Sequence, residues 1–311
     1  MRPLLFLAGL ALPSAPLLAR GADAPFFVAE RNKGYASLQR AVDAIGGGSG
    51  TILIAPGTYR DCAVQDAGQI AYVARQPGTA IFDGGICEDK ATLVLGGRSA
   101  RVEGLVFQNL RVADRNGAGI RIEKGDLHVA DSLFRDSENG ILSASHPAGT
   151  ITVEQSTFSE LGGCEDGHGC SHSLYIGGYG RLIVRRSRFE RGTGGHYLKT
   201  RTPQVEIVDS SFDDSAGQRT NYLIDLSNGA TGTIARNSFV QGRNKENYSA
   251  VIMIAAEGAA NRSGGLTITD NQAAAVPGAE RTSAFISDKS GDPIRNGNNR
   301  LGAGIAPFAP G

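Results

Sequence analysis

The 311-residue chain contains 43 glycines and no tryptophan, and its 31 basic residues are balanced by 31 acidic ones. A net charge of zero provides no global positive field for nucleic acid, and the chain has too many hydrophobic residues for general disorder. The glycines follow no Gly-X-Y period, so collagen is excluded, and a chain with many tight turns favours β-structure made of short strands.

Residues 1–24 have the features of a secretory signal peptide. Arg2 supplies a positive start, residues 4–18 are largely apolar, and Ala-Asp-Ala at residues 22–24 fits a cleavage site. A buried N-terminal helix is the alternative, which two prolines in the apolar stretch disfavour. No later segment is apolar for long enough to span a bilayer. We therefore expect a secreted or periplasmic protein without a membrane span, in which residues 25–311 form a single domain.

A short amphipathic helix is predicted near residues 35–45. Ser37 can cap its N-terminus, and four apolar residues fall on one helical face: Leu38, Ala41, Val42 and Ile45. The helix is followed by the apolar segment Thr-Ile-Leu-Ile-Ala-Pro-Gly-Thr-Tyr, which ends at residue 59.

Four cysteines in an exported chain indicate disulfide bonds. We pair Cys62 with Cys87 and Cys164 with Cys170, which is one of three possible connectivities. The alternative is a zinc site made of Cys164, His168, Cys170 and His172. That spacing matches no common zinc module, and an oxidising compartment disfavours it.

A recurring pattern of alternating apolar residues that ends in phenylalanine is the strongest signal in the chain. Its copies end at Phe107, Phe134, Phe158, Phe189, Phe212 and Phe239, with a degenerate last copy at Ala273. A second short apolar strand precedes each of these copies. A period near 24 residues, with two short strands per copy and no helix, is typical of a solenoid. We expect an all-β, parallel β-helix in which the phenylalanines stack inside and the helix covers the first coil. Residues 276–311, which lack a clean repeat, are expected to form an irregular C-terminal cover.

The predicted helix followed by "TILIAPGTYRD", together with the coil pattern over residues 33–275, resembles the opening of a right-handed parallel β-helix of the pectate-lyase-like superfamily. The resemblance implies the fold. It leaves the activity open, because this fold hosts lyases, hydrolases, epimerases, esterases and adhesins.

The alternation of side chains along the strands predicts which residues share the outer face. If Leu174, Leu198 and Ile224 point inward, Tyr175, Lys199 and Asp225 form a vertical column outside, because successive coils stack about 4.8 Å apart. By the same rule Arg201 and Tyr197 lie outside, whereas Tyr222 lies inside. His172 and His196 lie where two of these strands begin.

An exported β-helix points, by analogy of fold, to an acidic polysaccharide as the substrate. This cluster of residues suits the cleavage of such a polymer by β-elimination. Such a lyase needs a base, a cation for the uronate carboxylate and an acid for the leaving oxygen. Lys199 is assigned as the base, on condition that burial and neighbouring cations depress its pKa. Arg201 or Arg219 is expected to bind the carboxylate, and Tyr175, His196 and His172 to handle protons. The remaining expected substrate-binding residues are Asp225, Tyr197, Asn228 and His168, the last on a loop that would form a rim over the site.

Alternative functions remain open at this stage. The Lys and Arg pair resembles that of alginate and chondroitin lyases, but their full arginine motif and calcium cluster are absent from the sequence. Asp225 and Glu257 are the only calcium ligands we would nominate, so no cofactor is predicted, although calcium is possible. A glycoside hydrolase, a uronate C5-epimerase and a non-catalytic carbohydrate-binding adhesin are the competing functions. We expect a monomer that binds a polysaccharide or oligosaccharide and no nucleic acid.

Overall fold

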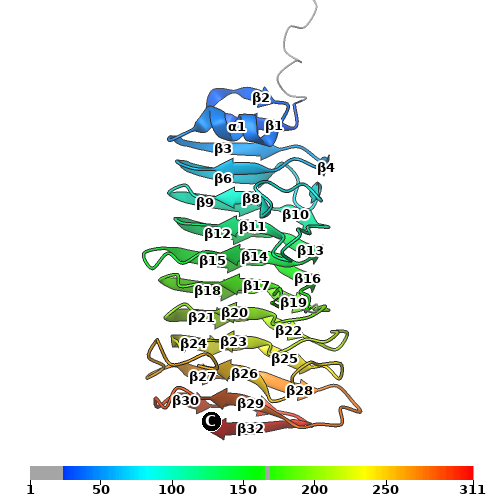
Figure 1. Ribbon diagram of the computed structural model, residues 1–311, viewed down its shortest axis with the longest axis vertical. Helices are drawn as coiled ribbons and strands as arrows, with labels where there is room; N and C mark the ends of the chain where they lie inside the picture. Colours follow the sequence, from blue (N-terminus) through cyan, green and yellow to red (C-terminus); the bar gives the residue numbers. More distant parts are fainter. Residues whose placement is uncertain (1–23, 165–168, 311) are drawn as a thin grey trace, which may run out of the picture.

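The computed structural model describes residues 24–164 and 169–310, which form a parallel β-helix. Strands from successive coils stack along the long axis of the molecule (Figure 1). The proposed signal peptide, apart from its last residue, and His168 lie outside the described residues. In the part of the chain that the structure describes, no helix is long and apolar enough to cross a membrane.

Three sheets form the walls of the β-helix. Sheet A contains β1 (Phe26–Val28), β2 (Lys33–Tyr35), β3 (Ser49–Ile54), β6 (Gln69–Ala74), β9 (Ser99–Glu103), β12 (Asp126–Ala130), β15 (Thr150–Glu154), β18 (Arg181–Arg185), β21 (Gln204–Val208), β24 (Thr231–Ala235), β27 (Thr267–Thr269) and β30 (Arg295–Gly297). Sheet B contains β4 (Gly57–Tyr59), β7 (Ala80–Asp83), β10 (Leu105–Gln108), β13 (Leu133–Ser137), β16 (Thr157–Leu161), β19 (Arg188–Glu190), β22 (Ser211–Asp213), β25 (Ser238–Gln241), β28 (Gln272–Ala275) and β31 (Arg300–Leu301). Sheet C contains β5 (Ala63–Gln65), β8 (Ala91–Leu95), β11 (Ala118–Ile122), β14 (Asn139–Ser143), β17 (Leu174–Ile176), β20 (Leu198–Thr200), β23 (Ile224–Leu226), β26 (Ala250–Ile254), β29 (Ser283–Asp288) and β32 (Ile305–Pro310).

Each coil has three strands, where the sequence pattern predicted two. The segment that ends in phenylalanine contains a sharp corner, so it contributes one strand to sheet A and the next to sheet B. The corner residue adopts positive φ, at 47–57° in Asp131, Gln155, Arg186, Asp209, Arg236 and Asp270. The apolar alternation continues across this corner, which explains why the sequence reads as one strand.

A column of short polar side chains holds this corner in register. Ser156 Oγ accepts a hydrogen bond from the backbone N–H of Ser132 at 3.3 Å, and Ser187 Oγ accepts one from Ser156 N–H at 3.3 Å. Asn237 and Asn271 continue the same pattern in later coils. These side chains are buried, so each one satisfies a backbone donor that would otherwise lack a partner inside the protein.

The interior contains the predicted column of phenylalanines. Seven rings from Phe82 to Phe239 stack with centroids 4.7–5.6 Å apart and interplanar angles of 3–17°. Their spacing matches the rise of one coil, because each phenylalanine is paired in register with the next along sheet B. The column ends where Phe239 pairs with Ala273.

The N-terminal helix covers the first coil, as the sequence predicted. Helix α1 (Leu38–Ile45) begins after Ser37, whose side chain accepts a hydrogen bond from Arg40 N–H. Its four predicted apolar residues are buried. The short helix η1 (Ala29–Arg31) lies between β1 and β2 in the chain, and these two strands pair in antiparallel orientation.

Both predicted disulfides are present, between Cys62 and Cys87 and between Cys164 and Cys170. The second bond excludes the zinc alternative, because disulfide sulfurs are not thiolate ligands.

The expectation of an irregular C-terminal cover is wrong. Four strands in residues 283–310 extend all three sheets, with β29 and β32 in parallel register. The sequence concealed these coils because Ala273 and Leu301 replace the phenylalanine that marks the earlier copies.

Replacing Phe158 with alanine tests the aromatic column. The ring is fully buried between Phe134 and Phe189, so Phe158→Ala should destabilise the fold by about 3–5 kcal/mol through lost burial and a residual cavity. Chemical and thermal unfolding would measure the loss. Phe308→Ala is the matched control, since that ring is 42% exposed and should change stability far less. Equal effects of the two substitutions would contradict this account of the core.

Candidate functional site

A column of polar residues lies on the outer face of sheet C. Tyr175, Lys199 and Asp225 are paired in register on β17, β20 and β23, as the strand alternation predicted. We call these three residues the outer ladder. Their neighbours Leu174, Leu198 and Ile224 are fully buried in the core, which forces the intervening residues outward.

The alternation fails at the residues that precede these strands. Tyr197, expected outside, is 1% exposed, and its hydroxyl donates a 2.8 Å hydrogen bond to Asp214 inside the protein. Tyr222, expected inside, stacks outside on His196, and Leu223 is buried in its place. The reason is that the strands begin only at Leu198 and Ile224, so the chain is still turning at these residues and the two-residue period does not apply. Tyr197 therefore cannot contact a bound sugar directly.

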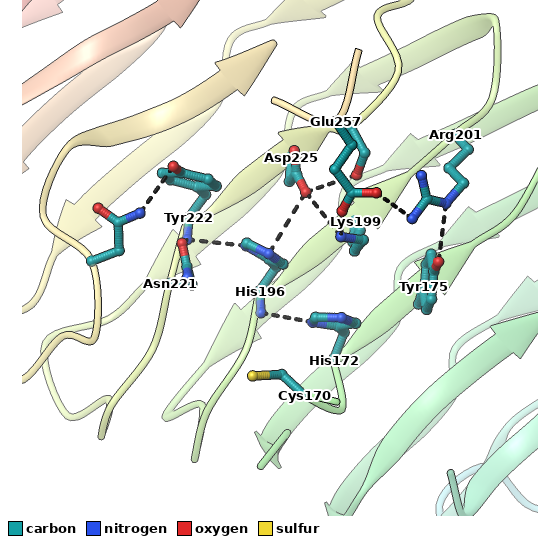
Figure 2. A network of polar contacts seen from close by, with 12 residues as sticks. Cys170, His172, Tyr175, His196, Lys199, Arg201, Asn221, Tyr222, Asp225 and Glu257 are labelled. Carbon is teal, nitrogen blue, oxygen red and sulfur yellow. Dashed lines mark hydrogen bonds and ion pairs between the residues drawn. The ribbon is translucent and has the colours of Figure 1, made fainter. Parts of the chain in front are cut away.

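Lys199 is held between two carboxylates. Its Nζ lies 3.4 Å from Asp225 Oδ2 and also contacts Glu257 Oε1 (Figure 2). Asp225 is 2% exposed, and its Oδ2 accepts a 2.7 Å hydrogen bond from Ser227, whereas its Oδ1 is buried without a hydrogen-bond partner. The sequence had led us to expect cations around Lys199, but its closest charged contacts are these two carboxylates.

Arg201 connects the outer ladder to Glu257 and to Asn228. Its Nη2 contacts Glu257 Oε2, and its Nε donates to the Tyr175 hydroxyl at 3.1 Å (Figure 2). Its Nη1 donates to Asn228 Oδ1 at 2.8 Å. The guanidinium also lies 5.9 Å from the centroid of the Tyr175 ring. Asn228 therefore lies beside the site and orients Arg201, and its expected contact with substrate stays a prediction.

Two stacked histidines flank the buried side of this network. The His172 and His196 rings are 4.9 Å apart, and Tyr222 continues the stack 5.3 Å beyond His196. His172 Nδ1 accepts from the backbone N–H of His196 at 3.0 Å, and His196 Nδ1 accepts from that of Tyr222 at 3.1 Å. In each neutral ring the proton must then be on Nε2, and His196 Nε2 lies 3.6 Å from Asp225.

Gly195 makes this placement of His196 possible. Its φ is 61°, and a Cβ at this position would lie 2.0 Å from the carbonyl oxygen of Ser171. Only glycine fits such a close approach of two turns.

Burial and charge separate the pKa values of the two carboxyl groups. Burial raises the pKa of Asp225, although Lys199 and Ser227 act in the opposite direction. Burial also opposes ionisation of Glu257, but its hydrogen bonds to Lys199 and Arg201 and their charges hold its pKa below the ordinary value. Burial lowers the pKa of His172 to about 3, and burial lowers that of His196 well below its usual range. Both imidazoles are thus neutral at pH 7.

The expected substrate-binding residue Arg219 is not part of this network. Arg219 donates a 3.0 Å hydrogen bond to the Cys164 carbonyl and lines a separate concavity of about 420 Å³ with Arg111 and Arg191. None of the outer-ladder residues lines that concavity. His168 lies outside the described residues, so its expected place on a rim stays a prediction.

Asp225 and Glu257 do not fit the calcium site that the sequence left possible. Both carboxylates contact the same ammonium group, so a cation bound between them would meet the charge of Lys199. Within residues 24–164 and 169–310, the one group of three metal-ligand side chains within ligand distance of one another is Cys164, Cys170 and Glu246, and its cysteines form a disulfide.

Sequence reasoning missed three residues of the network. Strand alternation placed Ser227 on the outer face, two residues after Asp225, but assigned it no role. Tyr222 was placed on the wrong face. Glu257 was considered only as a calcium ligand, and no periodic pattern indicates its contacts, since it lies after β26 in a loop.

Comparison with known proteins agrees with this architecture. A family model described as "Right handed beta helix region" matches residues 102–277, which is more than half of the chain. The chain belongs to the right-handed β-helix family. This match does not single out the pectate-lyase-like superfamily within that fold. A search of curated proteins found no match.

Among solved structures, this β-helix protein is similar to one from Geobacillus virus E2, ORF18. The two are 12% identical with a TM-score of 0.51, over 88% of this chain and 55% of the viral one. The chain thus spans about half the length of that protein. At this identity the likeness shows the fold alone.

The buried histidine predicts an acid-sensitive fold. The pKa of His172 is about 3 in the folded protein and near 6.5 in an unfolded chain, so the unfolded state binds more protons between these values. This single group should lower the free energy of unfolding by up to about 1.4 kcal/mol per unit as the pH falls from about 6.5 towards 3. The raised pKa of Asp225 gives the opposite slope at the acid end of this range.

Comparison of variants isolates the contribution of His172. In His172→Asn the side-chain oxygen can still accept the His196 N–H bond but does not titrate, so stability should depend less on pH than in the wild type. Denaturant unfolding at about pH 6.5 and pH 4.5 measures the difference. His128→Asn is the control, because His128 is only half-buried on the outer face of sheet A. An unchanged slope in His172→Asn would show that the buried imidazole is not responsible.

Proposed function

We propose that this protein is an exported enzyme that cleaves a uronate-containing polysaccharide by β-elimination at the outer ladder. The observation that carries the proposal is that Lys199 and Arg201 together hold one carboxylate, that of Glu257, on the outer face of sheet C. A uronate residue of an acidic polysaccharide presents the same group. The two disulfides support an oxidising, extracytoplasmic location.

Neutralising the uronate carboxylate is the main electrostatic task of such a lyase. Removal of the proton on the adjacent carbon leaves an enolate-like anion, whose charge develops on the carboxylate oxygens. Arg201 can approach these oxygens with its planar guanidinium, and Lys199 adds a second positive charge in a poorly solvated position, since it is 7% exposed. Asn228 and Tyr175 hold the guanidinium in place before substrate arrives.

Tyr175 is the group that we assign to proton transfer. Its hydroxyl accepts a hydrogen bond from Arg201, so it lies beside the place where the substrate carboxylate would bind. The phenolate form of Tyr175, whose oxygen accepts the hydrogen bond from Arg201, takes the proton from the carbon next to the carboxylate and becomes a phenol. A carbon–carbon double bond forms, and the bond to the leaving sugar oxygen breaks. The leaving oxygen then takes a proton, which the same phenol can return when both groups lie on one face of the sugar.

This assignment changes the role of Lys199. A general base must be free to accept the substrate proton, but the Lys199 nitrogen lies between Asp225 and Glu257 and contacts both carboxylates. Lys199 therefore acts as an electrostatic group. His172 and His196 act as neutral supports, because burial keeps them unprotonated and their Nδ1 atoms are engaged by the backbone.

Glycoside hydrolysis is the second candidate, and a specific observation favours it. Asp225 and Glu257 contact the same ammonium, and their pKa values are shifted in opposite directions, as in an acid and nucleophile pair. However, Asp225 is 2% exposed beneath Lys199, whereas a catalytic acid must reach the glycosidic oxygen. We therefore rank hydrolysis below elimination.

Incubation with a panel of uronate polymers distinguishes these functions. Elimination creates unsaturated uronate ends that absorb ultraviolet light, and hydrolysis creates reducing ends without that absorbance. A C5-epimerase would exchange the substrate proton with solvent deuterium without cleavage, and an adhesin would bind without any product. Unsaturated ends are the expected result, and their absence across alginate, pectate, hyaluronan and chondroitin would contradict the lyase proposal.

Removal of a single hydroxyl tests the role of Tyr175. Tyr175→Phe should lower kcat on a responsive polymer by at least about a hundredfold, the usual contribution of proton transfer, while the thermal midpoint stays close to that of the wild type. Tyr35→Phe is the matched control, because that ring also lies next to a cation, Lys33, but beside the N-terminal helix. If Tyr175→Phe retained wild-type kcat, another residue would have to transfer the proton.

A further inference from the structure

Glu257 is the outermost member of the charged network. It lies after β26, two coils beyond the β20 strand that carries Lys199, and its backbone N–H donates a 2.9 Å hydrogen bond to the Ser227 carbonyl. Its side chain is 40% exposed, whereas those of Lys199 and Asp225 are 9% and 2% exposed. The carboxylate can therefore leave the network by rotating into solvent, without moving a strand.

The two oxygens of Glu257 contact different cations. Oε1 contacts Lys199 Nζ, and Oε2 contacts Arg201 Nη2 (Figure 2). Lys199 lies on β20 and Arg201 follows directly after the strand ends at Thr200, and both side chains reach the same carboxylate. The space between them is thus sized for one planar carboxylate.

The charges of the network can be balanced by one anion in addition to Asp225. Lys199 and Arg201 carry two positive charges, and buried Asp225 is in contact with only the first of them. If Asp225 is counted as the ion-pair partner of Lys199, the three groups other than Glu257 sum to one positive charge. Glu257 brings the sum to zero, and a single monovalent carboxylate from outside would do the same.

We propose that Glu257 occupies the position of the substrate carboxylate and is displaced by it. Glu257 is then a specificity residue: the site admits a ligand that presents one carboxylate able to replace it at Lys199 and Arg201, and rejects neutral sugars, which cannot compensate the two cations. This inference rests on the uronate substrate class proposed above. It does not depend on the reaction that follows binding.

The experiment compares the affinity of anionic and neutral probes for two variants. The probes are oligogalacturonate, oligomannuronate and hyaluronan oligosaccharides, each with its methyl-esterified, uncharged counterpart, and binding is measured by calorimetry at low salt. Glu257→Gln and Glu257→Ala remove the competing charge, so both should bind the responsive anionic probe about threefold to tenfold more tightly than the wild type, as the loss of exposed ion pairs allows. The methyl esters should bind the variants no more tightly than they bind the wild type.

Glu190→Gln is the matched control. Glu190 also pairs with an arginine, Arg188, but on sheet B, so its loss should leave affinity unchanged. Thermal unfolding of each variant shows whether the fold is retained. Agreement between the alanine and glutamine variants shows that the change in affinity comes from the lost charge and not from the new side chain.

The possible outcomes separate this inference from the proposed reaction. Tighter binding by both Glu257 variants without unsaturated products would support the displacement and contradict the lyase. Unsaturated products with equal or weaker binding by the Glu257 variants would support the lyase and overturn the displacement. Failure of the wild type and both variants to bind any of the anionic probes would also overturn it.

Discussion

The in-register stacking of one coil on the next determines where every outward side chain of this protein lies. Leu174, Leu198 and Ile224 form one buried column, and the parallel pairing of β17, β20 and β23 aligns their outward neighbours as strictly as the core residues themselves. A shift of one residue in any of these strands would turn a buried aliphatic side chain to solvent and a polar side chain into the core. The free energy that stabilises the core therefore also fixes the outer ladder.

That constraint explains how a lysine and an aspartate become nearly buried on an outer face. Stacked coils are about 4.8 Å apart, so Lys199 lies directly beside Asp225, and Tyr175 packs against the other side of the lysine with its ring centroid 5.6 Å from Nζ. Arg201 and Glu257 cover the sides of Lys199 that Asp225 and Tyr175 leave open. Charged groups that would be solvated on a single strand thus shield one another from water, and burial becomes the largest influence on the pKa of Asp225 and His172.

The sequence predicted those parts of the structure that repeat. The phenylalanine column, helix α1, both disulfides and the vertical alignment of Tyr175, Lys199 and Asp225 all follow from local periodicity or spacing. Prediction failed where the period is interrupted. Tyr197 and Tyr222 lie in a turn, where alternation has not yet begun, and the last coils lack the phenylalanine that marks the others.

Glu257 shows the limit of such reasoning most clearly. It follows the sequence position of Lys199 by 58 residues and reaches it from a loop, so its contact depends on the path of that loop, which no repeat encodes. The same independence gives it a role that ladder residues cannot have. A strand residue is fixed by its neighbours above and below, but a loop carboxylate can be exchanged for another anion while the cations stay in place. The balanced net charge of the chain is therefore compatible with an anionic ligand, because the positive charge that would bind it is neutralised in the free protein by a group that can move.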